Sequence, residues 1–171
     1  LKLMPLSPYH LLFESVEGGE TRARYSIIAL DPDILWKCED GKSYRCNEVG
    51  NNPVFQEDGD DIFASLRKLV NDVHIDIPDA LPPMASGLFG YMGYDMVKHM
   101  ERLPDANPDT IGIPESLYMR PRMTVIFDSV KDVALVITIV TPEQSVSAEA
   151  AYRAAEDRIN QITETLNANL S

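Results

Sequence analysis

The chain has 171 residues, of which 44% are hydrophobic and 25% are charged, and its formal net charge is −12. This length and composition suit one globular domain that can bury a sizeable core. The negative charge argues against a nucleic-acid partner or an anionic membrane surface, because both are dense in negative charge. No apolar run approaches the roughly 20 residues that span a bilayer, and the start shows no signal-peptide pattern. We therefore expect no membrane partner and a cytoplasmic location.

The first pattern along the chain predicts a β-hairpin. Two apolar runs, Leu11–Phe13 and Tyr25–Leu30, flank a polar loop that contains Gly18-Gly19, and this arrangement indicates two strands joined by a turn. Pairing of the strands would bring five polar or aromatic residues to one end of the hairpin: Glu14, Ser15, Arg24, Tyr25 and Ser26. A carboxylate, a hydroxyl and a guanidinium beside an aromatic ring suit a zwitterionic amino acid better than a phosphate or a metal ion. The alternative is an ordinary hairpin with a solvated loop.

A second hairpin is predicted next. Ile34–Cys38 and Lys42–Cys46 alternate apolar and polar residues around Asp40-Gly41. Both residues of that pair tolerate positive φ, so the pair indicates a tight turn. We expect Trp36, the only tryptophan, on the core face of this hairpin.

Helical and irregular segments follow. Asp60 or Asp61 should cap a helix whose apolar residues recur on one face. These residues are Ile62, Phe63, Leu66, Leu69, Val70 and Val73. After a proline-rich connection, Ala85–Gly90 is expected to be a buried strand whose glycines allow close backbone packing. Tyr91–Met100 is expected to be a short helix or turn, with Met92, Met96 and Met100 in the core.

The last third of the chain predicts a strand pair and a helix. Glu101–Pro114 is expected to be a long surface loop, and Leu117–Asp128 and Asp132–Thr141 to be antiparallel strands. The second of these is apolar and β-branched, so we expect it to be central and covered on both faces. From about Ser147 the chain should be helical, with an apolar stripe of Tyr152, Ala155, Ile159, Ile162 and Leu166. We expect this stripe to be uncovered in the chain alone and to cause self-association.

Together these elements predict an α+β fold in one domain. The strands outnumber the helices and occur as hairpins, which indicates a mainly antiparallel β-sheet, two-layered, with a few packed helices. No internal repeat or low-complexity tract interrupts this pattern.

The sequence contains no recognisable catalytic pattern. It has no Gly-rich phosphate loop and no Ser/His/Asp arrangement. Cys38 and Cys46 are the only cysteines and are expected to be reduced core or strand residues, without a histidine at zinc spacing. His10, His74 and His99 are scattered along the chain. We therefore predict no catalytic residue, no metal site and no cofactor within this chain.

Three blocks of the sequence carry a resemblance to a known family. LLFESVEGG followed by RYSIIALDPD resembles the LLES…GRYS region near the start of anthranilate synthase component I. The segment GLFGYMGYD (Gly87–Asp95) resembles that family's G-x-x-G-Y-x-x-Y-D segment, and Ile113–Thr138 resembles the paired strands that follow it. The resemblance covers nearly all of the chain, in order. Ala23 and Ala29 stand where the family usually has glycine, and Phe13 stands where it usually has leucine.

The resemblance implies that residues 1–171 are the N-terminal regulatory domain of such an enzyme. In that family this region forms much of the allosteric pocket for tryptophan, the end product that inhibits the enzyme. The implied effector residues are Phe13, Glu14, Ser15, Arg24, Tyr25 and Ser26. Ser15 would hydrogen-bond the polar end of tryptophan, and Glu14 would face its ammonium group or order the loop. Tyr25 and Phe13 would shape the apolar wall.

The resemblance also implies a reaction that this chain would not perform alone. The family converts chorismate and glutamine-derived ammonia to anthranilate and pyruvate, with the chorismate and Mg²⁺ sites in a larger C-terminal catalytic domain. Implied partners are tryptophan, that C-terminal domain and component II, a glutamine amidotransferase. Two alternatives stay open. The chain could be the N-terminal domain of aminodeoxychorismate synthase component I, or a stand-alone amino-acid-sensing domain.

Overall fold

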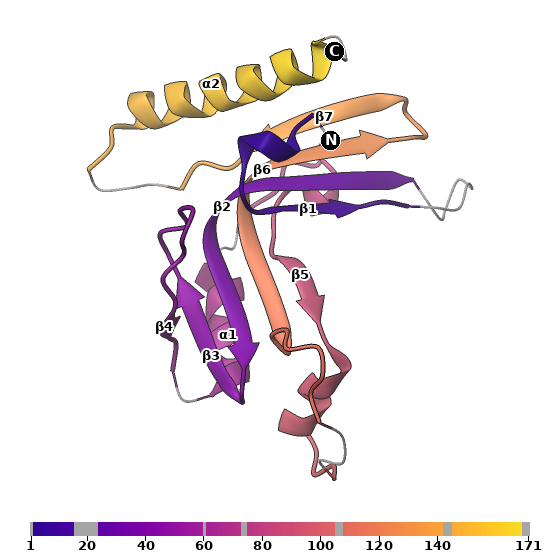
Figure 1. Ribbon diagram of the computed structural model, residues 1–171. Helices are drawn as coiled ribbons and strands as arrows, with labels where there is room; N and C mark the ends of the chain where they lie inside the picture. Colours follow the sequence, from indigo (N-terminus) through magenta and orange to yellow (C-terminus); the bar gives the residue numbers. More distant parts are fainter. Residues whose placement is uncertain are drawn as a thin grey trace. The chain divides into compact units, whose positions relative to one another are not determined.

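The computed structural model describes residues 2–15, 24–59, 61–72, 75–104, 108–141 and 145–168. Its strands form a seven-stranded sheet with the order β4-β3-β2-β6-β5, in which β1 also pairs with β2 and β7 with β6 (Figure 1). The strands are β1 (His10–Phe13), β2 (Tyr25–Glu39), β3 (Lys42–Cys46), β4 (Gln56–Glu57), β5 (Phe89–Met92), β6 (Ser116–Asp128) and β7 (Val133–Thr138). The helices are α1 (Ile62–Asp72), α2 (Ala148–Asn167) and three 3-10 helices, η1 (Met4–Leu6), η2 (Pro83–Ala85) and η3 (Tyr94–His99). Every pairing with a described register is antiparallel, which confirms the predicted α+β fold.

The chain divides into two compact units, each made of separate segments. The first unit contains Leu1–Pro32, Ile77–Ser86 and Pro121–Ser171, and the second contains Asp33–Asp76 and Gly87–Arg120. The long strands β2 and β6 therefore each supply residues to both units.

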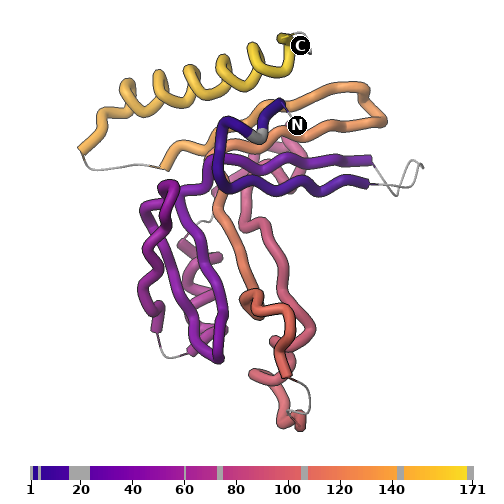
Figure 2. The backbone as a smooth tube through the Cα atoms, in the orientation of Figure 1, coloured from indigo at the N-terminus to yellow at the C-terminus, as the bar shows by residue number. Residues whose placement is uncertain are grey.

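The first unit contains the hairpin predicted at the start of the chain. β1 and β2 run side by side (Figure 2), with His10 opposite Leu30 and Phe13 opposite Ile27. The two apolar runs therefore pair as expected. The turn predicted at Gly18-Gly19 lies outside the described residues.

Helix α2 covers one face of the sheet of the first unit and closes its core. Ser147 caps the helix by accepting the N–H of Ala150 on its hydroxyl at 3.2 Å. The predicted apolar stripe packs on a buried cluster of the same unit, which contains Leu3, Leu30, Met123, Val125 and Ile162. The expectation of an uncovered stripe was wrong, because the chain's own sheet covers it and only Tyr152 of the stripe is exposed. None of the described helices is both long and apolar enough to cross a membrane.

Strand β7 differs from its prediction. It pairs with β6, from Val133 opposite Asp128 to Thr138 opposite Met123, and with no other strand that the structure describes. Val133 and Ala134 are exposed, and Leu135–Thr138 are half-buried. The expectation of a central strand covered on both faces was therefore wrong. Its apolar composition reflects the contact with α2 on one face.

Strand β2 is longer than either apolar run that predicted it. The runs ending at Leu30 and beginning at Ile34 belong to one strand. Asp31 lies between them with a φ of 50°, a value that aspartate tolerates better than most residues. The chain thus passes through Asp31-Pro32 without leaving the strand. Beyond it, the second hairpin is confirmed, because Asp40 and Gly41 have φ values of 51° and 71° between β2 and β3.

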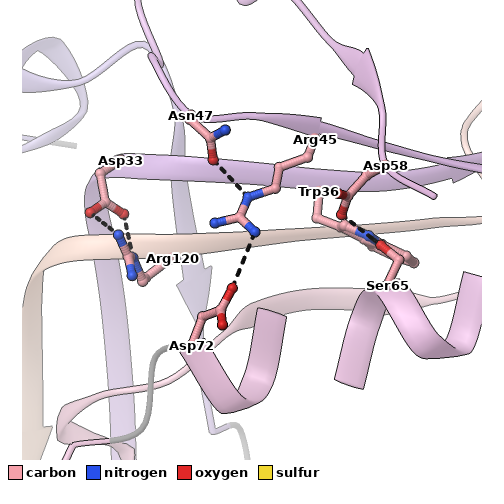
Figure 3. Close-up of polar contacts among 8 residues, drawn as sticks. All are labelled: Asp33, Trp36, Arg45, Asn47, Asp58, Ser65, Asp72 and Arg120. Carbon is pink, nitrogen blue, oxygen red and sulfur yellow. Dashed lines mark hydrogen bonds and ion pairs between the residues drawn. The ribbon is translucent and has the colours of Figure 1, made fainter. Parts of the chain in front are cut away.

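The core of the second unit is organised around Trp36. Its side chain is fully buried, as predicted, in a cluster with Ile34, Cys38, Ile62, Leu69 and Met96. The indole Nε1 donates to the Ser65 hydroxyl at 2.7 Å, and that hydroxyl donates to the Asp58 carboxylate at 2.7 Å (Figure 3). This chain of hydrogen bonds satisfies the one polar atom of the tryptophan inside an apolar core.

Helix α1 is confirmed, but its buried face differs from the predicted one. Asp61 is its cap, since the Asp61 carboxylate accepts the N–H of Ala64 at 2.6 Å. Val70 was predicted on the apolar face but is exposed, whereas Ser65 is buried against Trp36. Asp60, the other predicted cap, and Val73, predicted on the apolar face, lie outside the described residues.

The segment after α1 contains less buried structure than predicted. Ala85 belongs to η2, and the strand is β5 at Phe89–Met92, which is half-buried to exposed rather than buried. The close backbone approach predicted for its glycines is confirmed at Gly90, opposite Tyr118 of β6. Of the methionine stripe, Met96 is buried, but Met92 and Met100 are exposed, so the stripe prediction was wrong for those two. The described parts of Glu101–Pro114 form the expected irregular loop.

A buried ion pair joins β2 and β6 within the second unit. The Arg120 guanidinium donates to both oxygens of Asp33, at 2.6 and 2.5 Å, and both side chains are largely buried (Figure 3). A bidentate pair of this kind satisfies two charges that the fold removes from water. Nearby, Arg45 bonds Asn47 at 2.6 Å and lies 3.5 Å from Asp72 at the end of α1.

Both cysteines are free and buried, as predicted. Burial is the main cause that raises the pKa of the Cys38 thiol to about 12, and the hydrogen bond to Glu115 is the second. Cys38 is therefore a neutral thiol at neutral pH.

Candidate effector-binding site

The sequence-predicted site residues lie at one end of the first hairpin. Glu14 and Ser15 directly follow β1, and Arg24 directly precedes β2. Because Phe13 pairs with Ile27, the chain leaving β1 and the chain entering β2 are at the same end. The structure thus brings the ends of both segments together, as the pattern of apolar runs predicts. The candidate site predicted from the sequence consists of Phe13, Glu14, Ser15, Arg24, Tyr25 and Ser26.

These six residues are all at least partly accessible to solvent. Phe13, Glu14 and Ser15 are exposed, and Arg24, Tyr25 and Ser26 are half-buried. A phenylalanine that is 41% exposed at the end of a strand offers apolar area to a ligand. Carboxylate, hydroxyl and aromatic groups are therefore all within reach of solvent at this end of the hairpin.

Arg24 is held by a carboxylate at the end of β6. Its Nε and Nη2 donate to the two oxygens of Asp128 at 2.9 and 2.7 Å, and its carbonyl accepts the N–H of Ser129 at 2.9 Å. The guanidinium carbon also lies 4.8 Å from the centre of the Tyr25 ring, a cation–π distance. Arg24 therefore ties the hairpin to the β6–β7 turn and stacks on Tyr25.

The electrostatics of this pair favour its charged form. The Arg24 hydrogen bond, aided by the backbone N–H groups of Lys131 and Val130, lowers the pKa of Asp128 to about 2 despite the opposing effect of burial. The same hydrogen bond raises the pKa of Arg24. The pair is thus fully ionised at neutral pH.

Comparisons with known proteins identify the family of the chain. No family model matches it, but curated relatives do. Anthranilate synthase component 1 of Cereibacter sphaeroides is 38% identical over 161 residues, which are 93% of this chain and 32% of that protein. The protein of the same name from Acinetobacter calcoaceticus is 34% identical over 163 residues, 91% of this chain and 31% of that protein. The chain belongs to the anthranilate synthase component I family.

A solved structure of this family shares the fold. The crystal structure of anthranilate synthase component I from Streptococcus pneumoniae matches with a TM-score of 0.63 and 27% sequence identity, covering 91% of this chain and 32% of that one. The resemblance carried by the three sequence blocks is thereby confirmed. The chain spans about a third of the length of the anthranilate synthase component I relatives it matches.

Sequence reasoning missed one residue next to the candidate site, the carboxylate that binds Arg24. Asp128 is the last residue of β6, and it lies 104 positions from Arg24 in the sequence. A carboxylate at the end of a predicted strand is only a weak indication of a partner for Arg24, because such residues usually cap the following turn. Asp128 does both, since it also accepts the N–H groups of Val130 and Lys131 at 3.1 and 3.2 Å.

We expect the Arg24–Asp128 pair to stabilise the fold in a pH-dependent way. The folded-state pKa of Asp128, about 2, is below its ordinary value of 3.8, so the native state binds fewer protons than the unfolded state. The stabilisation should be complete above pH 4 and be lost as the pH falls through 2. Asp128→Asn should therefore lower the urea midpoint at pH 7, and the difference from wild type should shrink on acidification. Asp157→Asn, an exposed change in α2, is the control and should show no such difference. A pH-independent effect of Asp128→Asn would contradict the assignment.

Proposed function

We propose that this chain is the N-terminal regulatory part of an anthranilate synthase component I and carries most of a tryptophan-binding pocket. The observation that carries the proposal is the end of the first hairpin, where the predicted effector residues lie on two paired segments and are all exposed or half-buried. Family membership supports the same reading over nearly the whole chain. The chemistry of the residues fits an amino acid, which needs groups for an ammonium, a carboxylate and a side chain.

Each residue has a distinct part in the proposed pocket. Glu14 faces the ligand ammonium group, and Ser15 hydrogen-bonds its polar end. Phe13 and Tyr25 form the apolar wall. Arg24 acts as a positioning residue, because its guanidinium is already engaged by Asp128 and stacks on Tyr25. Ser26 follows at the start of β2 as a further polar contact.

The proposed parent enzyme converts chorismate and ammonia to anthranilate and pyruvate. In this proposal the chorismate and Mg²⁺ sites belong to a C-terminal catalytic part outside the 171 residues, so the chain alone forms no anthranilate. The partners are that catalytic part and component II, which supplies ammonia from glutamine. The names of the relatives support the anthranilate enzyme over the aminodeoxychorismate alternative. The cytoplasmic location stays a prediction.

The test is feedback inhibition of the full-length enzyme. Ser15→Ala and Glu14→Ala should each raise the tryptophan concentration for half-inhibition by about 10-fold or more, because a hydrogen bond to a charged group contributes about 1.5–3 kcal/mol. An effector acts only through its different affinities for two states of the enzyme. Most of the coupling between tryptophan binding and activity should therefore disappear. The uninhibited rate of anthranilate formation should change little.

Matched changes elsewhere in the chain control for general effects. Ser145→Ala and Glu156→Ala alter exposed residues outside the hairpin and should leave inhibition normal. Normal inhibition of both Ser15→Ala and Glu14→Ala would show that the effector pocket is elsewhere. Loss of the uninhibited rate in these variants would contradict a purely regulatory role.

A further inference from the structure

Three side chains of metal-ligand type meet in the second unit. Cys38 lies in β2, His99 ends η3, and Glu115 directly precedes β6. Their Sγ, ring-nitrogen and carboxylate-oxygen atoms all lie within 4.8 Å of one another. Cys38 Sγ is 3.2 Å from Glu115 Oε2, and His99 Nε2 is 3.0 Å from the same oxygen. Residues 77 positions apart in the sequence are thus brought into direct contact.

The spacing of these atoms is close to that of ligands on one zinc ion. Zinc binds thiolate sulfur at about 2.3 Å and nitrogen or oxygen at about 2.0–2.2 Å in a tetrahedral arrangement. Pairs of ligand atoms around one ion are therefore roughly 3.3–3.6 Å apart. The two contacts to Glu115 are only slightly shorter than this, and Cys38 Sγ and the His99 ring nitrogen lie within 4.8 Å of each other. Small side-chain rotations would therefore bring all three around one ion.

We propose that Cys38, His99 and Glu115 form a binding site for a divalent ion of the zinc type. Thiolate, imidazole and carboxylate are the three ligand types that zinc takes in proteins, whereas Mg²⁺ and Ca²⁺ prefer oxygen alone. When the ion binds, the Cys38 thiol loses its proton to solvent and the thiolate sulfur bonds the ion. The imidazole binds through Nε2 as the neutral ring, with its proton on Nδ1.

The backbone at two of the three ligands, Cys38 and Glu115, is well anchored. Cys38 is paired with Ser43 across the β2–β3 hairpin, and the Glu115 carbonyl accepts the N–H of Gly93 at 2.8 Å. The N–H of Gly41 points at the same Glu115 oxygen, at 3.4 Å. Ligands held by separate, hydrogen-bonded segments favour a defined geometry at the ion.

A neighbouring pocket provides access and the right charge. Of the three proposed ligands, Glu115 lines a pocket of about 570 Å³ in the second unit, so an ion and a water as fourth ligand would approach from the Glu115 side. Four further carboxylate residues line this pocket: Glu39, Asp40, Asp95 and Asp109. A pocket with several carboxylates concentrates cations.

The alternative is a hydrogen-bond network without a metal. In the metal-free chain the Cys38 thiol and His99 ring both bond Glu115, so the cluster is already satisfied. The two readings differ in a measurable property, because only a metal site produces a thiolate-to-metal bond.

Cobalt(II) binding to the full-length protein tests the proposal. After chelation and dialysis, titration with Co²⁺ should give the near-ultraviolet band of a thiolate-bound ion and the visible bands of tetrahedral cobalt. Zn²⁺ should abolish both bands and raise the unfolding temperature. Cys38→Ala should bind one equivalent less cobalt and lose the thiolate band. His99→Gln should weaken zinc binding at least about 100-fold, as much as the loss of a supporting residue costs in known sites.

Cys46→Ala is the matched control, because Cys46 is also a free, buried cysteine of the same unit. It should keep the thiolate band and the full cobalt equivalent. The absence of a thiolate band in the wild-type protein would overturn the proposal, as would its loss in Cys46→Ala or its persistence in Cys38→Ala. If Cys38→Ala fails to fold, the wild-type spectrum and His99→Gln, which is only partly buried, still decide the question.

Discussion

Replacing Gly90 by alanine should lower the free energy of unfolding by at least about 3 kcal/mol, the upper part of the range for overpacked sites. A Cβ on Gly90 would lie 1.9 Å from the Leu117 carbonyl oxygen and 2.8 Å from Tyr118 Cα. Both atoms belong to the backbone of the paired strand β6, so no side-chain rotation can relieve the contact. The strands would have to separate and lose their hydrogen bonds. For a chain of this size, thermal unfolding should shift down by about 6–12 °C.

Gly50→Ala is the control for this prediction. A Cβ on Gly50 meets no atom within 4 Å, and the change removes freedom mainly from the unfolded chain. It should leave the unfolding temperature unchanged or raise it slightly. Equal stability of the Gly90→Ala and Gly50→Ala proteins, measured by circular dichroism, would show that β5 and β6 are not this close in solution.

Arg120→Ala should be comparably severe, for an electrostatic reason. It leaves the buried Asp33 carboxylate without its two charge-assisted hydrogen bonds. Breaking one partner of a buried pair costs about 3–5 kcal/mol, because the remaining charge stays desolvated. Urea unfolding at pH 7 measures this loss.

The neighbouring pair on β6 offers a matched comparison. Arg122 lies 3.6 Å from Asp31, and both side chains are substantially exposed. Arg122→Ala should therefore cost no more than about 1 kcal/mol, as exposed ion pairs usually do. Replacing both buried partners, with Asp33→Leu and Arg120→Met, should recover much of the stability lost in Arg120→Ala. A double variant as unstable as Arg120→Ala would contradict desolvation as the cause.

Local patterns predicted the elements whose determinants are close in sequence. The Asp40-Gly41 turn needs two residues that tolerate positive φ, and that pair is visible as a dipeptide. The α1 cap at Asp61 and the α2 cap at Ser147 are likewise local signals. The first hairpin followed from two apolar runs, and its pairing was confirmed.

Burial was harder to predict, because it depends on partners that are distant in sequence. Val70 fits the apolar face of α1 by spacing, yet the face rotates toward Ser65, whose hydroxyl satisfies Trp36. Strand β7 has the composition of a central strand but gains its cover from α2 on one face only. Met92 and Met100 match the spacing of Met96 but lie on a strand and a turn rather than on one helix.

The same limit applies to the sites. The position of Glu14, Ser15, Arg24, Tyr25 and Ser26 at one hairpin end followed from the strand pattern. The Arg24–Asp128 pair and the contact of Cys38, His99 and Glu115 each join segments far apart in the chain. Spacing rules for metal sites consider ligands that are close in sequence, so they could not predict the second of these.

The one-sided cover of β7 has a consequence for handling the protein. Its sequence VALVIT contains no proline and no charge, the composition that favours edge-to-edge strand addition and cross-β aggregation. Helix α2 shields this segment, with Val136 in the shared apolar cluster and Arg158 bonding Thr138 at 3.4 Å. The helix thus covers the apolar face of β7 that would otherwise be available to a second chain. A chain shortened before Ala148 would present the bare strand to its neighbours and precipitate, even with every other strand intact.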